Sequence, residues 1–277
     1  MLVPATMPGV TDGQVARMLR PRWARARSYL VAGLVVCPLM FVLTCLSMMS
    51  IAVAGRGVSW WLVLPVVGAA LPAAIVLGSL RSLLYEPPRW GRAAFLTGGC
   101  QLLLGGIPGV GMAMNAGTAL ATTGASAVFL LQLALLVLGF VFAHRANRVL
   151  LSPPCPELGA TPFTVAFRAR IADLGLMSGS AVVAEDRVEW SARRHKGRGG
   201  PTAHGSLTFA RLRGARPTVL PDTGRWIPWL RLSDGSTVHA SPGPAVLLAS
   251  DTGEWMLPVT DAEQFVQLLH WRVNRRT

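Results

Sequence analysis

The residues best suited to chemistry form a short basic run in the C-terminal half of the chain, Arg193-Arg194-His195-Lys196-Gly197-Arg198. Arginine presents a planar fork of N–H donors that matches a phosphate group, and lysine adds a compact positive charge. The run lies in a glycine-rich loop between two expected strands, where a solvated loop is the alternative interpretation. We predict a binding site for lipid phosphates or another anion, formed by the basic residues Arg193, Arg194, Lys196 and Arg198.

The other reactive side chains fall in no arrangement that catalysis requires. His195, His204 and His239 lack the spacing of a metal site and have no cysteine companions in their domain. The four cysteines of the chain form no CxxC pair. Serine, histidine and aspartate occur in no nucleophile motif. The sequence therefore predicts a protein that is not an enzyme and that holds no metal or cofactor.

Four long apolar segments occupy the N-terminal half, and they determine how the rest of the chain is organised. Of the 277 residues, 52% are hydrophobic and 14% charged, and the charges avoid these segments. About 20 apolar residues are enough to span a bilayer. We predict a four-helix transmembrane domain over residues 29–151, with its spans at about 29–53, 58–80, 93–114 and 126–143.

The first segment has a rival interpretation, because Ala52-Val53-Ala54 resembles a signal-peptide cleavage site. The apolar core of a signal peptide has about 7–15 residues, and this segment is much longer. Its length favours a span that the mature protein retains.

Glutamines and glycines are the notable residues inside the spans. Gln101 and Gln132 are expected to hydrogen-bond between the third and fourth segments. Gly105 and Gly109 form a GxxxG pair that lets a neighbouring helix approach closely, while Pro108 adds a kink. The alternative is a broken third helix that lines a transport cavity. The spans lack ionisable side chains, which counts against an ion-coupled transporter.

The charges outside the spans predict how the protein is oriented. Residues 1–28 carry five arginines and are expected to be a disordered basic segment. The link between the second and third spans and the stretch after the fourth are also basic, whereas the other two links carry only Arg56. The positive-inside rule then places both termini in the cytoplasm. We predict a multi-pass protein of a bacterial inner (cell) membrane.

The basic charge does not indicate a nucleic-acid partner. The formal net charge is +13, and it is divided between the two ends of the chain. A nucleic-acid-binding domain concentrates basic residues with aromatics on one face. A basic excess beside a bilayer is instead typical of attraction to anionic lipid headgroups.

A proline-rich linker, residues 152–162, leads to a C-terminal domain over residues 163–277. Period-two alternation and turn signals predict about seven short antiparallel strands, with a type I′ hairpin turn at Asp234-Gly235. The period then becomes helical after a capping box formed by Thr260 and Glu263. Residues at helical spacing follow, namely Phe265, Leu268, Leu269 and Arg272, while Val266, Trp271 and Val273 broaden the apolar side of this helix.

This order of elements resembles a pleckstrin-homology-type (PH-like) domain. The resemblance is carried by the hairpins at Asp234-Gly235 and Asp251-Thr-Gly253 and by the ending from Trp255 to Phe265. The layout is similar to that of bacterial membrane proteins that append a PH-like domain to transmembrane helices. The resemblance implies an antiparallel β-sandwich or barrel with a C-terminal α-helix, and binding of a lipid or a protein rather than catalysis.

The predicted protein is thus a transmembrane α bundle followed by a small β domain. We expect a membrane-anchored interaction protein whose cytoplasmic domain docks an unidentified protein partner or an anionic lipid surface. The alternative is a subunit of a small transporter or channel with a regulatory cytoplasmic domain.

Overall fold

The computed structural model describes residues 3–57, 59–115, 117, 119–172, 176–195, 200–222, 224 and 226–275. Its internal contacts divide the chain into two compact units. The helical unit comprises Met1–Pro8 and Met18–Ser152, and the β unit comprises Gly9–Arg17 and Pro153–Thr277.

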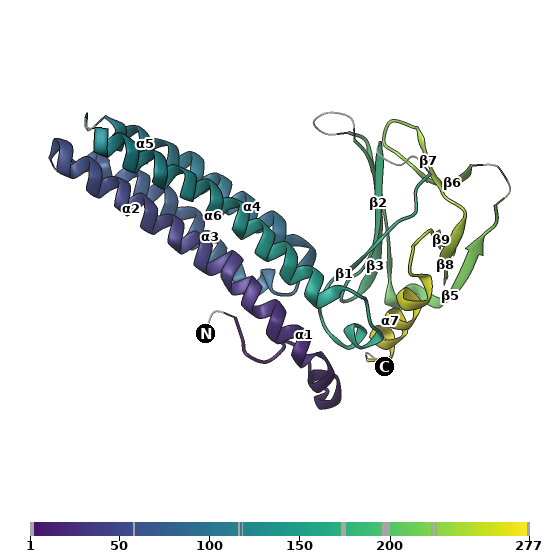
Figure 1. Cartoon of the computed structure of the whole chain (residues 1–277). Helices are drawn as coiled ribbons and strands as arrows, with labels where there is room; N and C mark the ends of the chain where they lie inside the picture. The colour runs from purple at the N-terminus through teal and green to yellow at the C-terminus, as the bar shows by residue number, and fades with distance from the viewer. Residues whose placement is uncertain are drawn as a thin grey trace. The chain divides into compact units, whose positions relative to one another are not determined.

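Four long apolar helices, counted over the described residues, suggest a multi-pass membrane protein (Figure 1). The elements in chain order are α1 (Gly13–Val31), η1 (Ala32–Val36), α2 (Cys37–Arg56), η2 (Trp60–Val63), α3 (Leu64–Leu83), η3 (Pro87–Arg89), α4 (Trp90–Gln101), η4 (Leu102–Gly106), α5 (Ile107–Met114) and α6 (Ala119–Leu151). The candidate spans are Gly13–Gly55, Trp60–Leu83, Pro87–Met114 and Ala121–Leu151. Length and composition qualify each of them to cross a bilayer.

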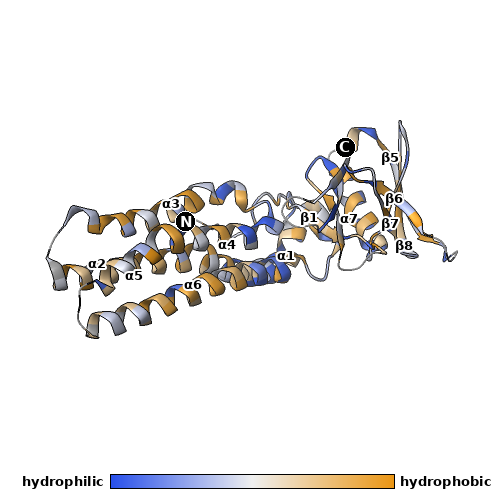
Figure 2. Ribbon diagram, turned by 90° about the horizontal axis from the view of Figure 1, so that it is seen from above, coloured by the Kyte–Doolittle hydropathy of each residue, from blue (hydrophilic) through white to orange (hydrophobic). Residues whose placement is uncertain are grey.

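Polar residues of the helical unit gather at one end of the bundle. Figure 2 shows mainly apolar colour along α2 to α6 and hydrophilic colour around α1 at one end. Successive helices alternate in direction, so the turn between α3 and α4 and the end of α6 lie at this same end. Five arginines lie in these two segments or in the adjoining helix turns: Arg81, Arg89, Arg92, Arg145 and Arg148.

The N-terminal stretch is helical from Gly13 onward, which corrects the prediction of disorder over residues 1–28. The helix buries a stripe of apolar side chains spaced by three or four residues: Leu19, Trp23, Ala26 and Leu30. The chain ahead of it folds back, and the Trp23 indole Nε1 donates a hydrogen bond to the Pro4 carbonyl oxygen at 3.2 Å. The sequence did not reveal this apolar stripe, because arginines occupy the positions between its apolar residues.

Two wide π-helical turns, η1 and η4, each lie just ahead of a proline. Proline lacks an N–H group, and its ring clashes with the carbonyl four residues earlier in a regular helix. In each wide turn, the residue just before the proline donates its N–H to a carbonyl five residues earlier. Cys37 N–H donates to the Ala32 carbonyl, and Ile107 N–H donates to the Leu102 carbonyl. The third span is therefore continuous, and the expected kink at Pro108 takes the form of a wide turn.

The β unit is a small antiparallel sheet region followed by a C-terminal helix (Figure 1). Its elements are η5 (Pro156–Ala160), β1 (Val165–Arg168), β2 (Met177–Val183), β3 (Arg187–Arg194), β4 (Thr202–Thr208), η6 (Phe209–Arg211), β5 (Leu212–Leu220), β6 (Ile227–Arg231), β7 (Thr237–Ala240), β8 (Gly243–Ser250), β9 (Gly253–Leu257) and α7 (Ala262–Asn274). The strands form a sheet in the order β1-β2-β3-β4, a second in the order β5-β8-β9, and the hairpin β6-β7.

The described residues form nine strands where the sequence predicted about seven. The sequence did not reveal β5, because Gly214 and Pro217 interrupt its apolar pattern. Proline is tolerated at the edge of a sheet, where its missing N–H would not face a neighbouring strand. β5 is such an edge strand, since β8 is its partner in the sheet.

Two local predictions in this unit were wrong in detail. A type I′ turn needs positive φ at both central residues. Gly235 has φ +81°, but Asp234 does not, and Gly235 N–H bonds to the Leu232 carbonyl at 3.0 Å. The loop therefore has three residues with glycine in the left-handed position.

The predicted capping box also does not form, because α7 begins at Ala262 after Asp261, without a side-chain cap bond.

The core of the β unit forms where α7 packs against the strands. Phe265 of α7 meets Phe167 of β1 edge to face, with ring centroids 5.0 Å apart. Arg272, at helical spacing from this residue, is also buried, with 3% of its surface exposed. Its guanidinium donates to six backbone carbonyl oxygens: Leu158, Gly159, Thr161, Phe163, Val183 and Ala184. Arg272 thus fastens α7 to η5 and to the end of β2.

Candidate functional site

The predicted basic cluster begins at the end of β3, where strand alternation separates its first two members. Arg193 is exposed, and its cross-strand partners are Ser178 on β2 and Thr202 on β4. Arg194 lies on the opposite face of the strand. Lys196 and Arg198 lie outside the described residues. The structure therefore does not bring Arg193 and Arg194 into one site.

Arg194 is engaged with the β6–β7 turn. Its Nη1 atom lies 3.6 Å from Oδ2 of Asp234. The pKa of the Asp234 carboxyl is lowered, mainly because the Ser236 hydroxyl and the Ser236 backbone N–H donate hydrogen bonds to it, with a smaller contribution from the Arg194 charge. The Asp234 carboxylate therefore offsets the charge of Arg194. Of the two cluster arginines that the structure describes, Arg193 is the one exposed without this partner.

A polar hollow of about 330 Å³ lies on the outer face of β2, β3 and β4. Its lining contains hydroxyl groups, one arginine and one histidine: Ser178, Gly179, Ser180, Ser191, Ala192, Arg193, Thr202 and His204. The register brings them together, because Ser191 pairs with Ser180 on one side and with His204 on the other. Hydroxyl and guanidinium donors converging on one hollow suit an anionic oxygen group.

Neither His204 nor the hydroxyl groups were predicted from the sequence as members of this site. The only signal for them was the alternation of β4, which places Thr202, His204 and Ser206 on one face. Recognising the site needed the pairing of β4 with β3, because His204 becomes a neighbour of Arg193 only through that register.

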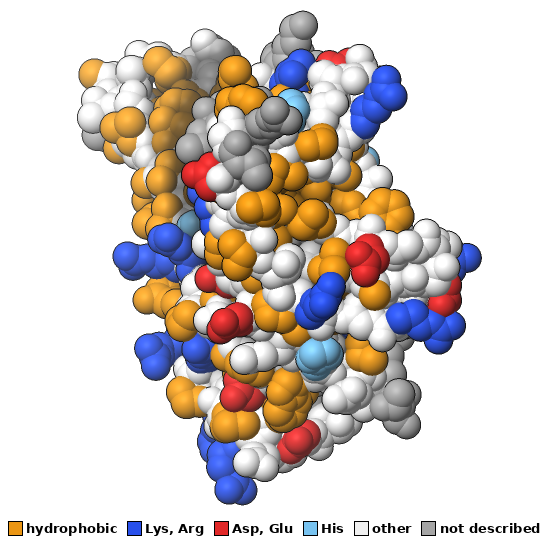
Figure 3. Space-filling model, turned by 90° about the vertical axis from the view of Figure 1, so that its right-hand side faces the viewer, with side chains coloured by type: hydrophobic (Ala, Val, Ile, Leu, Met, Phe, Trp, Pro, Cys, Tyr) orange, Lys and Arg blue, Asp and Glu red, His pale blue; other side chains and the backbone are white. Residues whose placement is uncertain are grey.

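The basic groups on the face drawn in Figure 3 form no single large patch, because they are interspersed with apolar and acidic side chains. Among the residues that the structure describes, no group of three or more His, Cys, Asp and Glu side chains could hold a metal ion.

The two glutamines of the helical unit are buried, but their partners differ from those predicted. Gln101 Nε2 donates to the carbonyl oxygens of Pro38 at 3.0 Å and Ala69 at 2.9 Å, so it joins α4 to α2 and α3. Gln132 Nε2 lies 3.1 Å from the Thr44 hydroxyl and joins α6 to α2. Both glutamines therefore hold helices together, as predicted, but Gln101 bonds to the first and second segments and Gln132 to the first, so the expected bond between the third and fourth segments is not the one they make.

The glycines of the third span differ in how tightly they pack. A Cβ atom on Gly105 would lie 2.7 Å from the Pro65 carbonyl oxygen and 2.8 Å from the Ala69 Cβ. A Cβ atom on Gly68 of α3 would lie 2.2 Å from the Leu104 carbonyl oxygen. At Gly109 the nearest atoms are at 3.5 Å, which is ordinary contact. Gly105 and Gly68 therefore mark the closest approach of η4 to α3 among these positions.

The chain has no match among protein-family models, curated proteins or solved structures. Its function must therefore be inferred from the geometry of its own residues.

Proposed function

We propose that the chain is a membrane-anchored interaction protein whose β unit is a PH-like domain that docks on an anionic lipid surface. A four-stranded sheet, a three-stranded sheet and a following helix are the parts expected of such a domain. The hairpin β6-β7 is an addition between β5 and β8. Fold analogy alone is a weak argument for function, so the docking surface is argued from its residues.

The observation that carries this proposal is the polar hollow with Arg193. Its guanidinium and His204 stand among four hydroxyl groups on an exposed sheet face. These groups are donors for phosphate oxygens, and the predicted basic loop continues directly from the same strand. A basic side chain close to an anionic bilayer contributes about 1 kcal/mol to attraction.

We further propose that both termini lie in the cytoplasm of a cell whose inner membrane holds the four spans. The support is the gathering of arginines at one end of the helical bundle. The rule that basic loops stay on the cytoplasmic side then places the β unit beside the anionic leaflet.

The test uses the full chain in nanodiscs made of a neutral lipid. Binding of added vesicles with and without phosphatidylglycerol is measured over a series of salt concentrations. We expect anionic vesicles to bind, with an affinity that falls steeply as salt rises. Arg193→Gln should weaken binding about fivefold, which corresponds to about 1 kcal/mol.

The matched control is Arg216→Gln, which removes the same charge at an exposed position on β5. Unchanged binding by Arg193→Gln, or an equal loss from both variants, would refute a site at the hollow. If vesicles fail to bind, crosslinking in native membranes tests a protein partner instead.

A further inference from the structure

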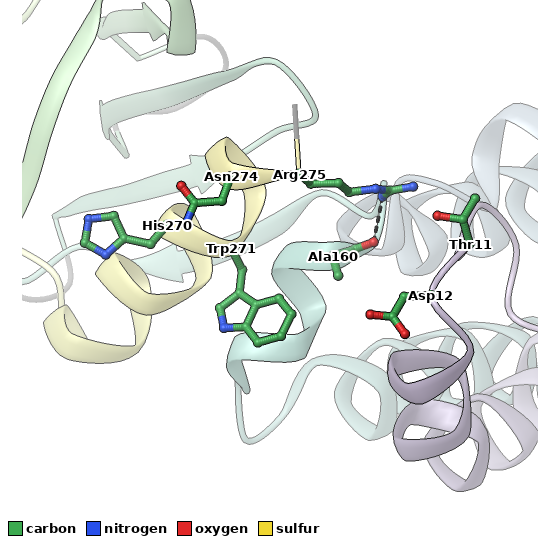
Figure 4. A pocket seen from close by; sticks show the side chains of 7 residues that line it. All are labelled: Thr11, Asp12, Ala160, His270, Trp271, Asn274 and Arg275. Carbon is green, nitrogen blue, oxygen red and sulfur yellow. Dashed lines mark hydrogen bonds between the residues drawn. The ribbon is translucent and has the colours of Figure 1, made fainter. Parts of the chain in front are cut away.

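A second pocket of the β unit is lined by the N-terminal segment and by α7. Its volume is about 480 Å³, and its lining residues are Thr11, Asp12, Ala160, His270, Trp271, Asn274 and Arg275. Figure 4 shows the Asp12 carboxylate and the Trp271 indole on opposite sides of this space, with the Arg275 side chain crossing above it beside Ala160. The pocket is distinct from the polar hollow on β2 to β4.

The two walls of this pocket are fastened to each other. Arg275 donates from Nη1 to the Ala160 carbonyl oxygen at 2.6 Å and from Nη2 to the Gly9 carbonyl oxygen at 2.9 Å. Gly9 has φ +72°, and a Cβ atom there would lie 2.5 Å from Pro162. The N-terminal segment is thus seated closely against the linker, and a single guanidinium bridges the two.

The indole wall is fixed by a second close contact. A Cβ atom on Gly159 would lie 2.6 Å from the Cβ of Trp271, so the C-terminal end of η5 lies directly against the base of this side chain. Trp271 still exposes 44% of its surface, although α7 buries Phe265, Leu268 and Leu269. An indole face held open at a pocket is suited to a cation, which the ring attracts electrostatically.

The charges of the pocket have opposite signs. Asp12 Oδ1 accepts hydrogen bonds from Gln14 N–H at 2.8 Å and Val15 N–H at 3.4 Å. Both bonds use the same oxygen, so Oδ2 remains available to a ligand as far as the described residues show. Arg275 supplies a guanidinium at the other end, beside the Thr11 hydroxyl.

We propose that this pocket binds a small zwitterion. Its ammonium group lies between the Asp12 carboxylate and the Trp271 ring, and its anionic group faces Arg275 and Thr11. A phosphoethanolamine headgroup and a free amino acid share this chemistry. Both opposed charges of the pocket are then matched by one ligand.

The test is titration calorimetry on the full chain in a maltoside detergent, whose headgroup carries no charge. Phosphoethanolamine and alanine are the two zwitterions, and ethylamine and inorganic phosphate supply each charge alone. We expect one zwitterion to bind more tightly than either single-charge compound. Binding of phosphoethanolamine assigns the pocket to a lipid headgroup, and binding of alanine assigns it to a free amino acid.

Asp12→Asn is the decisive variant, because asparagine caps a helix as well as aspartate does and removes only the charge. It should weaken zwitterion binding about two- to fivefold, as expected for an exposed ion pair. Trp271→Leu should cost a similar factor through the lost ring face. Asp222→Asn, a neutralised carboxylate in the loop after β5, is the matched control and should bind as the unaltered chain does.

Two results would overturn the proposal: failure of both zwitterions to bind more tightly than the single charges, or equal binding by Asp12→Asn and the unaltered chain. Arg193→Gln separates this site from the proposed lipid-docking surface. It should leave zwitterion binding unchanged, and Asp12→Asn should leave anionic vesicle binding unchanged.

Discussion

Arg272 offers the sharpest test of how the β unit is held together. Its guanidinium has five N–H groups and six carbonyl acceptors at 2.8–3.3 Å, so at least one N–H is shared. The acceptors belong to the segment 158–163 and to the end of β2. We predict that Arg272→Met loosens α7 from both, while the methionine keeps an apolar stem in the same space.

Two opposing effects set the magnitude. Removing a buried charge recovers its desolvation cost, which favours methionine. Against this, the backbone carbonyls remain in place, and each buried acceptor left without a partner costs about 1–3 kcal/mol. The Leu158 carbonyl keeps other donors, because it also accepts from the Thr161 N–H at 3.1 Å and from the Thr161 hydroxyl at 2.7 Å. The other acceptors outweigh one recovered charge, although local relaxation and entry of water reduce their sum. We expect a loss of about 3–5 kcal/mol, near the upper limit for one substitution.

Hydrogen exchange on the full chain in nanodiscs measures this loss. A small domain is stable by only about 5–15 kcal/mol, so protection of amides in α7 should fall by a factor of hundreds to thousands. Peptides from the helical unit provide an internal reference. Arg216→Met makes the same chemical change at an exposed position and should alter protection by less than about 0.5 kcal/mol.

A free energy of opening for α7 in Arg272→Met that lies within about 1 kcal/mol of the value in the unaltered chain would refute this role of Arg272. That result would mean that the carbonyls find other donors at little cost. Arg272→Lys provides a graded comparison, because an ammonium group has three donors where guanidinium has five. Its loss of protection should fall between those of the unaltered chain and the methionine variant.

Two further predictions concern the glycine contact and the β6–β7 turn. Gly105→Ala should destabilise the helical unit by about 1–3 kcal/mol, because its Cβ would press on the backbone of α3, whereas Gly111→Ala meets no atom within 4 Å and should be neutral or stabilising. Thermal unfolding of the two variants in detergent compares them directly. Asp234 has a lowered pKa in the folded chain, so its contribution to turn stability is complete above the unfolded pKa of about 4 and is lost as pH falls through the folded pKa. The protection factors of amides at residues 232–237, which divide out the intrinsic pH dependence of exchange, should therefore fall on acidification, and Asp234→Asn should remove that fall; an unchanged pH profile of protection in the variant would contradict this role of Asp234.

The sequence was sufficient for the apolar helices because their signal is local. A run of about 20 apolar residues identifies a span without knowledge of its neighbours. The alternating strands and the C-terminal helix were also predicted, since each has its own period. α1 was missed because its apolar stripe is narrow and arginines surround it, so that composition concealed the periodicity.

The candidate site was less predictable, because its members meet only through pairing between strands. Arg193 was identified from its charge, but the separation from Arg194 follows from the face that each residue takes on β3. His204 enters the hollow through the register of β4 with β3. Such a register depends on which strands pair in the folded protein, and local sequence patterns do not determine that pairing.

The prolines and glycines of the third span show how one sequence feature can support two different predictions. Pro108 and the glycines near it suggested either close packing or a broken helix that lines a cavity. In the wide turn η4, just ahead of Pro108, the Ile107 N–H donates to the Leu102 carbonyl five residues earlier, and Gly105 lies against α3. The space opened at Gly105 is occupied by the backbone of α3. Because a side chain there would disturb the fold itself, loss of flux in a Gly105→Leu variant would not distinguish a blocked pathway from a distorted bundle.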